Sequence, residues 1–553
     1  MAGHFGQPTS RLVEESVTGT RNPLLAVIFV FAFSALGFST TRYVAQSAGT
    51  FNGGTACNGQ TAITLATWNN LTLNPGDLTW VCGTITVPGT GGTGFNFGSN
   101  KGTSGNPLIL RFDTGAVVQS AAFSGSGGAT PAGGITLGTG NSYIVVDGNN
   151  LAGTVQNTAN GSNLTYQLGS AGVSGFGCNG CTIQNLNIDN IYVNVTGNSA
   201  IGDSSTVRAI DFSGSNWTIS GNVIHDCGWC IVDFGNNGDT NITVSGNNVY
   251  NLAHGYALAP GTGAALTNIF LTGNQFHDSA NWGAPGCFAH VDTLIHVFGN
   301  ATSSVNNLFV SNNYVYNPTG TCPTGFVFVE GGGSSTPAHL QNSFWWNNVF
   351  IVDPSDPTDL SQGWVGIFAG DSGVQQFISN TIIGNNGTDN TSCAAFSGES
   401  GFNNMSALTF KNNVIAPCGN PISIGVSGYG VNLAAADYNF YGQYGMNAFT
   451  WQSSSKDSFS AWKAACACDA HSVQNNNSGL NSDGSPQSGS PVIGAGVNLS
   501  SMANGSMASL QNDTSKGSTR TPVPRPPNGA WDIGAYAFGD PPAPPTNLAA
   551  TVN

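Results

Sequence analysis

Apolar and polar residues follow one six-residue pattern that recurs between residues 183 and 415. An apolar residue opens each copy, Gly or Asn stands two positions later, Asn usually follows, and an apolar residue closes the copy. This repeat predicts stacked parallel coils, in which equivalent positions of successive coils form columns about 4.8 Å apart. The eight copies span residues 183–188, 219–224, 244–249, 271–276, 310–315, 345–350, 378–383 and 410–415.

Two polar columns follow from this alignment. The third position of each copy is expected to lie in a bend with a left-handed backbone, which Gly and Asn tolerate best. The fourth position predicts an asparagine ladder, each side chain bonding the next, with Leu186 and Thr381 as interruptions. The bend column is Asn185, Gly221, Gly246, Gly273, Asn312, Asn347, Asn380 and Asn412, and the ladder column is Asn222, Asn247, Asn274, Asn313, Asn348 and Asn413.

A second short apolar strand follows the six-residue copy in each coil. Successive ladder asparagines from Asn222 to Asn348 are 25, 27, 39 and 35 residues apart, so the later coils must release their additional residues as loops. Loops on one side of a solenoid commonly build its binding face. The second strands span residues 209–212, 231–234, 257–259, 294–297, 326–329 and 365–368.

This organisation resembles the pectate-lyase-like superfamily over residues 140–430. The resemblance implies an all-β chain folded as a right-handed parallel β-helix, and a glycan bound beside one of its sheets. The Asn-Thr-Asp, Asp-Asp and Gly-His-Gly motifs of polygalacturonase-type hydrolases are not present as such, so no specific enzyme family is matched and no residue role is carried over. We expect an export segment (1–39), a cap with the first coils (40–147), a central β-helix (148–430), closing coils (431–539) and a Pro-rich tail (540–553).

The composition agrees with an all-β, exported chain and excludes one class of partner. Only 7% of the residues are charged, 77 are Gly, and the formal net charge is −15. Arg208 is the only basic residue between Asp113 and Phe410, so a nucleic-acid-binding protein is excluded, because phosphates need many cations. An eliminative lyase must also neutralise a uronate, so the scarcity of cations favours hydrolysis by carboxyl groups.

The N-terminus and the cysteines indicate the compartment. Basic residues precede a short apolar run, 24–33, and small residues follow it, as in a cleavable export signal; an uncleaved anchor is the alternative and would be the only membrane contact. The 12 cysteines predict disulfides, with zinc at the two CxxC motifs as the alternative. The expected pairs are Cys57 with Cys82, Cys287 with Cys322, and Cys393 with Cys418, beside the motifs Cys178–Cys181 and Cys227–Cys230.

One candidate site is a column directly after the six-residue copies. His225, Tyr250, His277 and Tyr316 align there, each followed by Asp or Asn. Neighbouring His and Asp side chains supply acid–base groups, and we assign His277 to catalysis and Tyr250 and Tyr316 to substrate binding. The alternative is structural, because aromatic columns stack and Asp and Asn favour bends.

A further candidate is the outer face of the second strand. Alternation places Asp211 and Asp233 outward, in adjacent coils, and His296 and Glu330 follow them as candidate catalytic groups beside the binding residue Arg208. Two neighbouring carboxyl groups share a proton or a cation, or catalyse glycoside hydrolysis. A solvated acidic face is the alternative.

Inserts and tryptophans complete the candidates. Trp282 and Trp346 are expected sugar-binding platforms, with Trp364 as a further one, whereas Trp345 aligns with the core. The insert 353–359 is a candidate Ca²⁺ site by its oxygen count, but its two prolines favour an ordinary acidic turn. We therefore expect a secreted protein that cleaves a polysaccharide or cell-surface glycan, with hydrolysis favoured over lyase chemistry. The alternative is a non-catalytic glycan-binding adhesin or structural surface solenoid.

Overall fold

The structure is a computed structural model that describes residues 39–539 with interruptions. The expected export segment and Pro-rich tail therefore lie outside the described residues. The interruptions are residues 126–130, 162–164, 194–206, 236–237, 281–290, 300–301, 318–324, 330–338, 353–363, 369–372, 385–391, 399–403, 426–428, 446–447 and 515–520.

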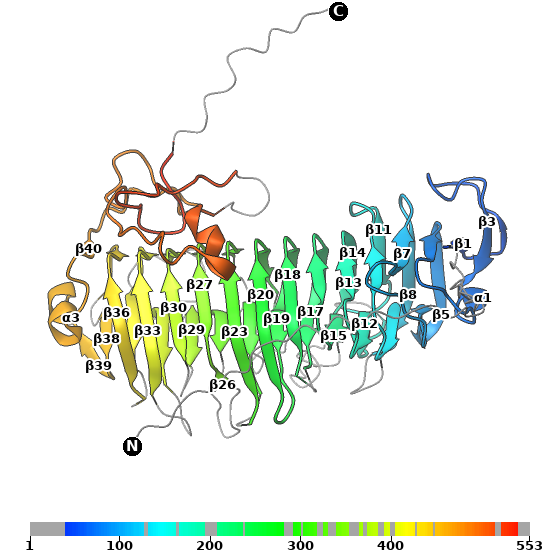
Figure 1. Ribbon diagram of the computed structural model, residues 1–553, viewed down its shortest axis with the longest axis horizontal. Coiled ribbons are helices and arrows are strands. Elements are labelled where there is room, and N and C mark those ends of the chain that lie inside the picture. Colours follow the sequence, from blue (N-terminus) through cyan, green and yellow to red (C-terminus); the bar gives the residue numbers. More distant parts are fainter. Residues whose placement is uncertain are drawn as a thin grey trace, which may run out of the picture. The chain divides into compact units, whose positions relative to one another are not determined.

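The described strands form parallel ladders that run through successive coils, so the expected right-handed parallel β-helix is confirmed (Figure 1). The first ladder precedes the asparagine bend in each coil. It consists of β1 (Thr41–Ala45), β4 (Leu78–Val81), β7 (Leu108–Phe112), β10 (Ile144–Asp147), β13 (Thr182–Gln184), β16 (Thr218–Ser220), β18 (Thr240–Ser245), β20 (Ala265–Thr272), β23 (Ser304–Ser311), β27 (Ser343–Trp346), β30 (Val374–Ile378), β33 (Met405–Lys411) and β36 (Val431–Asp437).

The second ladder begins directly after that bend. Its strands pair in the same coil order as those of the first ladder. It consists of β5 (Thr84–Gly92), β8 (Val117–Phe123), β11 (Gly153–Asn157), β14 (Leu186–Ile191), β17 (Val223–Asp233), β19 (Asn248–Leu258), β21 (Gln275–Ser279), β24 (Tyr314–Tyr316), β28 (Val349–Ile351), β31 (Thr381–Ile383), β34 (Val414–Ile415), β37 (Phe440–Tyr441) and β40 (Val473–Gln474).

The third ladder contains the second strand expected in each coil. The 11-residue strands β17 and β19 belong to both the second and the third ladder, because each pairs with different neighbours along its length. The other members are β6 (Phe95–Asn96), β9 (Ile135–Thr139), β12 (Ser170–Phe176), β15 (Val207–Phe212), β22 (Asp292–Val297), β25 (Gly325–Val329), β29 (Val365–Phe368), β32 (Ser392–Ser397), β35 (Asn420–Ile424) and β38 (Phe449–Trp451).

The asparagine ladder is confirmed and is longer than expected. Each Nδ2 donates to the Oδ1 of the next member over 2.9–3.2 Å, from Asn222 through Asn247, Asn274, Asn313, Asn348, Asn380 and Asn413 to Asn439. These amides are buried, so each hydrogen bond contributes without competition from water.

One alignment was wrong by a single residue. Asn380 is a ladder member, and Ser379 occupies the left-handed bend at φ 51°, whereas the other expected bend residues have φ between 53° and 66°. Phe377 pairs with Trp345 and with Phe410, so the true copy starts at Phe377 and not at Ile378. Two adjacent apolar residues made the register ambiguous in the sequence, and Thr381 does not interrupt the ladder.

Additional strands and helices lie at the two ends of the β-helix. At the N-terminal end, β2 (Gly49–Thr50), β3 (Thr61–Thr64) and the short helix α1 (Leu65–Trp68) lie beside β1. At the other end, β39 (Ser454–Lys456) pairs with β38, and α3 (Phe459–Cys466) forms where a short helix was expected. Within the central coils, β26 (His339–Leu340) pairs with β23.

The segment after the last coil packs back onto earlier coils. Its 3₁₀ helix η2 (Gly505–Gln511) and its neighbours bury the outer side of β27 and β30, where Trp346 and Ile378 contact Leu510 and Trp531. Figure 1 shows this segment, in orange and red, beside the coils. None of the helices within the described ranges is long and apolar enough to span a bilayer.

The expected disulfides form between neighbouring coils and within both CxxC motifs. Cys57 bonds Cys82, and Cys393 bonds Cys418. The motifs form Cys178–Cys181 and Cys227–Cys230, so zinc at these cysteines is contradicted. A further bond joins Cys466 to Cys468, and the expected pair Cys287–Cys322 lies outside the described residues.

Candidate functional site

A column of stacked rings runs along the outer face of the second ladder. His225 of β17, Tyr250 of β19, His277 of β21 and Tyr316 of β24 are register partners in consecutive coils. Their ring centroids are 4.8, 5.2 and 4.5 Å apart, and the planes deviate by at most 15°. Because the rings stack face to face, the column presents ring edges rather than flat ring faces.

The residue after each ring lies in a left-handed bend. Asp226, Asn251, Asp278 and Asn317 have φ between 47° and 52°, and the amides donate to the preceding carboxylates, Asn251 to Asp226 over 3.3 Å and Asn317 to Asp278 over 3.0 Å. The structural interpretation therefore explains why Asp and Asn occupy this column. It does not explain the histidines of the column, whose imidazole groups lie beside carboxylates and can take part in acid–base chemistry.

An acid–base cluster begins this column. Nδ1 of His225 lies 2.7 Å from Oδ2 of Asp226 and 3.5 Å from Oδ1 of Asp189, the register partner of His225 in β14. One donor atom from each of the three groups lies within 4.8 Å of the others. The side chains are 19% (Asp189), 22% (His225) and 26% (Asp226) exposed, so a ligand in solution reaches all three.

The environment shifts the proton affinity of two of these groups. Burial raises the pKa of Asp189 above its usual value, although the charge of His225 lowers it more than the charge of Asp226 raises it. Burial alone would lower the pKa of His225, but the Asp226 hydrogen bond and the charges of Asp189 and Asp226 raise it above its usual value. The cluster therefore holds a proton on Asp189 or His225 at higher pH than isolated side chains would.

Sequence reasoning missed Asp189, although a signal was present. Asp189 directly follows the copy 183–188, as His225 follows the copy 219–224, and Asn190 stands in the bend at φ 57° like Asp226. The column was started one coil too late because Asp189 is not aromatic. His277 repeats the arrangement further along, with Nδ1 at 2.6 Å from Oδ2 of Asp278 and Nε2 at 3.0 Å from Oδ1 of Asn248.

A second group of polar side chains lies on the outer face of the third ladder. Arg208, Trp229, His254 and Asp292 are register partners in β15, β17, β19 and β22. Next to them, His296 follows Ala257 in register, and all five side chains are at least nine-tenths buried.

The expected residues Arg208 and Asp211 are bound to each other in this group. Nη1 of Arg208 donates to Oδ2 of Asp211 over 2.7 Å, and the guanidinium carbon lies 4.1 Å from the centre of the Phe234 ring. The guanidinium group of Arg208 is therefore buried and paired with Asp211, and it is not exposed for binding to an anionic sugar.

The expectation that Asp233 points outward was wrong. Asp233 pairs in register with Phe212 and Leu258, two core residues, and is fully buried. Ile231, not Val232, pairs with the inward Ile210, so the alignment was off by one residue and the side chain changed faces. Burial, then Asp239 and then Asp211, raise the pKa of Asp233 well above its usual value.

Other expected platforms are covered or lie outside the described residues. Trp346 does face outward, but the closing segment buries it to 2% exposure, and its Nε1 donates to Oγ of Ser509 over 3.0 Å. Trp364 is a core residue, as is Trp345. Glu330, Trp282 and the candidate Ca²⁺ loop 353–359 fall among the residues that the structure does not describe.

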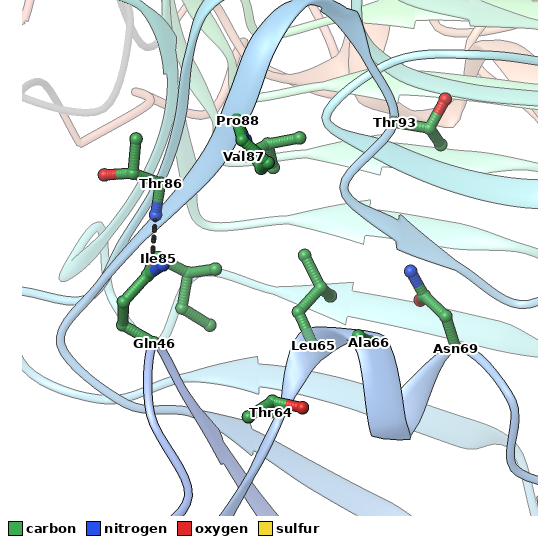
Figure 2. A pocket seen from close by; sticks show the side chains of 10 residues that line it. All are labelled: Gln46, Thr64, Leu65, Ala66, Asn69, Ile85, Thr86, Val87, Pro88 and Thr93. Carbon is green, nitrogen blue, oxygen red and sulfur yellow. Dashed lines mark hydrogen bonds between the residues drawn. The ribbon is translucent and has the colours of Figure 1, made fainter.

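A pocket of about 290 Å³ lies at the N-terminal end, between α1 and β5 (Figure 2). Oε1 of Gln46 accepts a hydrogen bond from the Thr86 backbone there over 2.6 Å. Its lining consists of apolar, hydroxyl and amide side chains and contains no titratable group, so it offers no acid–base chemistry.

Comparison with known proteins places the chain by its fold. No family model matches it, and no curated protein is significantly similar. Similar solved structures include a double mutant of the tailspike protein of E. coli bacteriophage HK620, with 13% identity, 80% of this chain and 72% of that chain covered, and a TM-score of 0.42. Pectate lyase Pel9A is another, with 15% identity, 91% of this chain and 98% of that chain covered, and a TM-score of 0.33. The polygalacturonase of Erwinia carotovora has 11% identity, 76% of this chain and 96% of that chain covered, and a TM-score of 0.32. The resemblance is one of fold, and the chain is a right-handed parallel β-helix, as the repeat predicted.

Proposed function

We propose that this protein is an exported enzyme that binds a polysaccharide outside the cell and hydrolyses it. The observation that carries the proposal is the partly exposed cluster Asp189–His225–Asp226, in which two carboxyl groups flank one imidazole. Carboxyl pairs of this kind are the reactive groups of most glycoside hydrolases.

Each group has a role that its environment supports. Asp189, whose pKa is raised, is the general acid that protonates the oxygen of the scissile glycosidic bond. Asp226, oriented by His225 and Asn251, is the carboxylate that attacks the anomeric carbon as this bond breaks. Water then displaces Asp226, and Asp189 takes up the proton of that water. The separation of at most 4.8 Å between donor oxygens is near the spacing of about 5–5.5 Å typical of retaining enzymes.

The ring column extends the cluster into a binding stripe. From Asp189 to Tyr316 it crosses five coils, which corresponds to about 19 Å at the strand spacing. The phenol hydroxyls of Tyr250 and Tyr316 along this length are suitable hydrogen-bonding partners for sugar hydroxyls. Because Arg208 is buried against Asp211, hydrolysis of a neutral glycan suits the face better than elimination from a uronate.

The test is a polysaccharide panel incubated with the exported chain and read for both reducing ends and unsaturated sugars. Asp189→Asn is expected to lower the release of reducing ends by about 10²–10⁴-fold, the contribution of a general acid. His471→Gln is the matched control, because His471 also contacts an aspartate, Asp437 at 2.7 Å, and stacks on a tyrosine, but lies far along the chain. Unsaturated products would refute hydrolysis, and unchanged release by Asp189→Asn would refute the site.

A glycan-binding protein without catalysis is distinguished by the same panel. Retention on an immobilised polysaccharide, with no product of either kind from any substrate, would replace the enzyme with a binding protein. In that case His277→Ala is expected to weaken retention, since His277 lies between the two tyrosines of the stripe.

A further inference from the structure

We infer that His254, Asp292 and His296 form a binding site for one divalent transition-metal ion of the zinc class. The three residues belong to successive coils, with His254 in β19 and the other two in β22. This site is separate from the proposed glycan-cleaving cluster and does not depend on it.

The spacing of the donor atoms matches a metal site better than a hydrogen-bonded group. Oδ2 of Asp292 lies 3.4 Å from Nδ1 of His254 and 3.4 Å from Nδ1 of His296. Hydrogen bonds between nitrogen and oxygen are shorter, at about 2.7–3.2 Å. Two ligands of a tetrahedral Zn²⁺, each about 2.0–2.1 Å from the ion, lie roughly 3.3–3.4 Å apart. One donor atom from each residue lies within 4.8 Å of the others.

The Asp292 carboxylate is buried without hydrogen bonds to its oxygens from any described residue. It is fully buried, and within the described part of the chain neither of its oxygens accepts a hydrogen bond. A carboxylate in such a position is costly unless a cation compensates its charge. Arg208, the only lysine or arginine between Asp113 and Phe410, is paired with Asp211 instead.

The backbone of β22 departs from regular pairing at this point. Between Asp292 and Ile295 it contains one residue more than β19 does between His254 and Tyr256, and one more than β25 between Gly325 and Val327. Such bulges often redirect a side chain beside a functional site. Here the bulge directly follows Asp292, and the regular pairing that resumes after it places His296 next to Ala257 of β19.

The donor set selects the chemical class of the ion. Two imidazoles and one carboxylate suit Zn²⁺, Fe²⁺, Ni²⁺ or Co²⁺, whereas Ca²⁺ and Mg²⁺ prefer oxygen ligands throughout. An ion here would connect two successive coils through their side chains. His296, expected from the sequence to be an acid–base group, would then be a ligand.

The experiment uses the tag-free exported chain, stripped of metal with a chelator and titrated with Co²⁺ as a spectroscopic probe and with Zn²⁺ by calorimetry. One equivalent is expected to bind, with visible Co²⁺ absorption, and Zn²⁺ is expected to raise the melting temperature. Asp292→Asn and His296→Gln are each expected to weaken binding by more than about 100-fold, since even outer-shell changes cost 10–100-fold. Asp189→Asn and His471→Gln should bind as the wild-type chain does.

Absence of saturable binding to the wild-type chain would overturn the inference, whatever the variants do. Binding that Asp189→Asn abolishes, or that Asp292→Asn leaves intact, would also overturn it. If a ligand variant fails to fold, X-ray absorption of the Co²⁺-loaded wild-type chain decides, since two imidazole ligands are expected and none would refute the site. The readout is metal binding without polysaccharide, so its failure is distinct from failure of the proposed hydrolase.

Discussion

Replacing Asn313 with alanine tests whether the buried asparagine ladder stabilises the coils. The Asn313 side chain makes four hydrogen bonds: Nδ2 donates to the Leu271 carbonyl (2.9 Å) and to Asn348 Oδ1 (2.9 Å). Its Oδ1 accepts from the backbone (3.1 Å) and side chain (3.0 Å) of Asn274. At about 1 kcal/mol for each hydrogen bond, the variant should lose about 4 kcal/mol of unfolding free energy.

The matched control is a second ladder that lies at the surface. Asn268 donates to Asn241 over 3.1 Å and accepts from Asn307 over 3.0 Å, in a bend with φ 58°. Asn268→Gly keeps that backbone and should cost less than about 1 kcal/mol, because water replaces the lost partners. Urea unfolding followed by circular dichroism measures both variants. Equal losses for the two would refute the idea that burial makes the inner ladder strong.

Three further predictions concern buried groups. Burial alone would raise the pKa of Asp113, but backbone N–H groups of Ala56, Cys57, Thr114 and Thr55 lower it below its usual value. This carboxylate therefore contributes stability above the pKa of an unfolded Asp, about 4, and loses it as the pH falls further. Asp113→Asn should lower the melting temperature at neutral pH but not in strong acid, and an equal loss at both would contradict this. The contribution of Asp233 to stability has the opposite pH dependence, because the pKa of this carboxyl group is raised in the folded chain. The protonated group favours the folded chain below about pH 4, and this stabilisation is lost as the pH rises. Asp233→Asn should raise the melting temperature at neutral pH relative to the wild-type chain, and a melting-temperature series that shows no gain would refute this. Trp346→Ala removes the side chain that Leu510 and Trp531 cover, so limited proteolysis should cut the closing segment faster than in the wild-type chain; unchanged cutting rates would show that this contact does not hold the segment.

The fold was accessible from the sequence because its determinants are local and repeated. A left-handed bend favours Gly or Asn, and Gly221, Gly246 and Asn312 stand where the chain turns. Stacking converts each such position into a column, so the ring column from His225 to Tyr316 was also predictable. The one error of register, at Asn380, arose where two apolar residues in succession made the start of a copy ambiguous.

The candidate sites depended on tertiary structure, because they depend on which face a side chain takes. Asp233 points inward because the part of β17 that pairs with β15 is shifted by one residue from the register that the sequence predicted. No local pattern in the sequence specified that shift. His254 and Asp292 are 38 residues apart and become register neighbours only because β19 and β22 are in successive coils. A bulge in β22 then accompanies their approach to His296, and the closing segment covers Trp346 from more than 150 residues away. The sequence by itself determined the coil, its bends and its columns, since each rests on the backbone preference of single residues. Only the tertiary structure decided which polar side chains are exposed, paired or gathered together, since that depends on coil lengths and on contacts between distant segments.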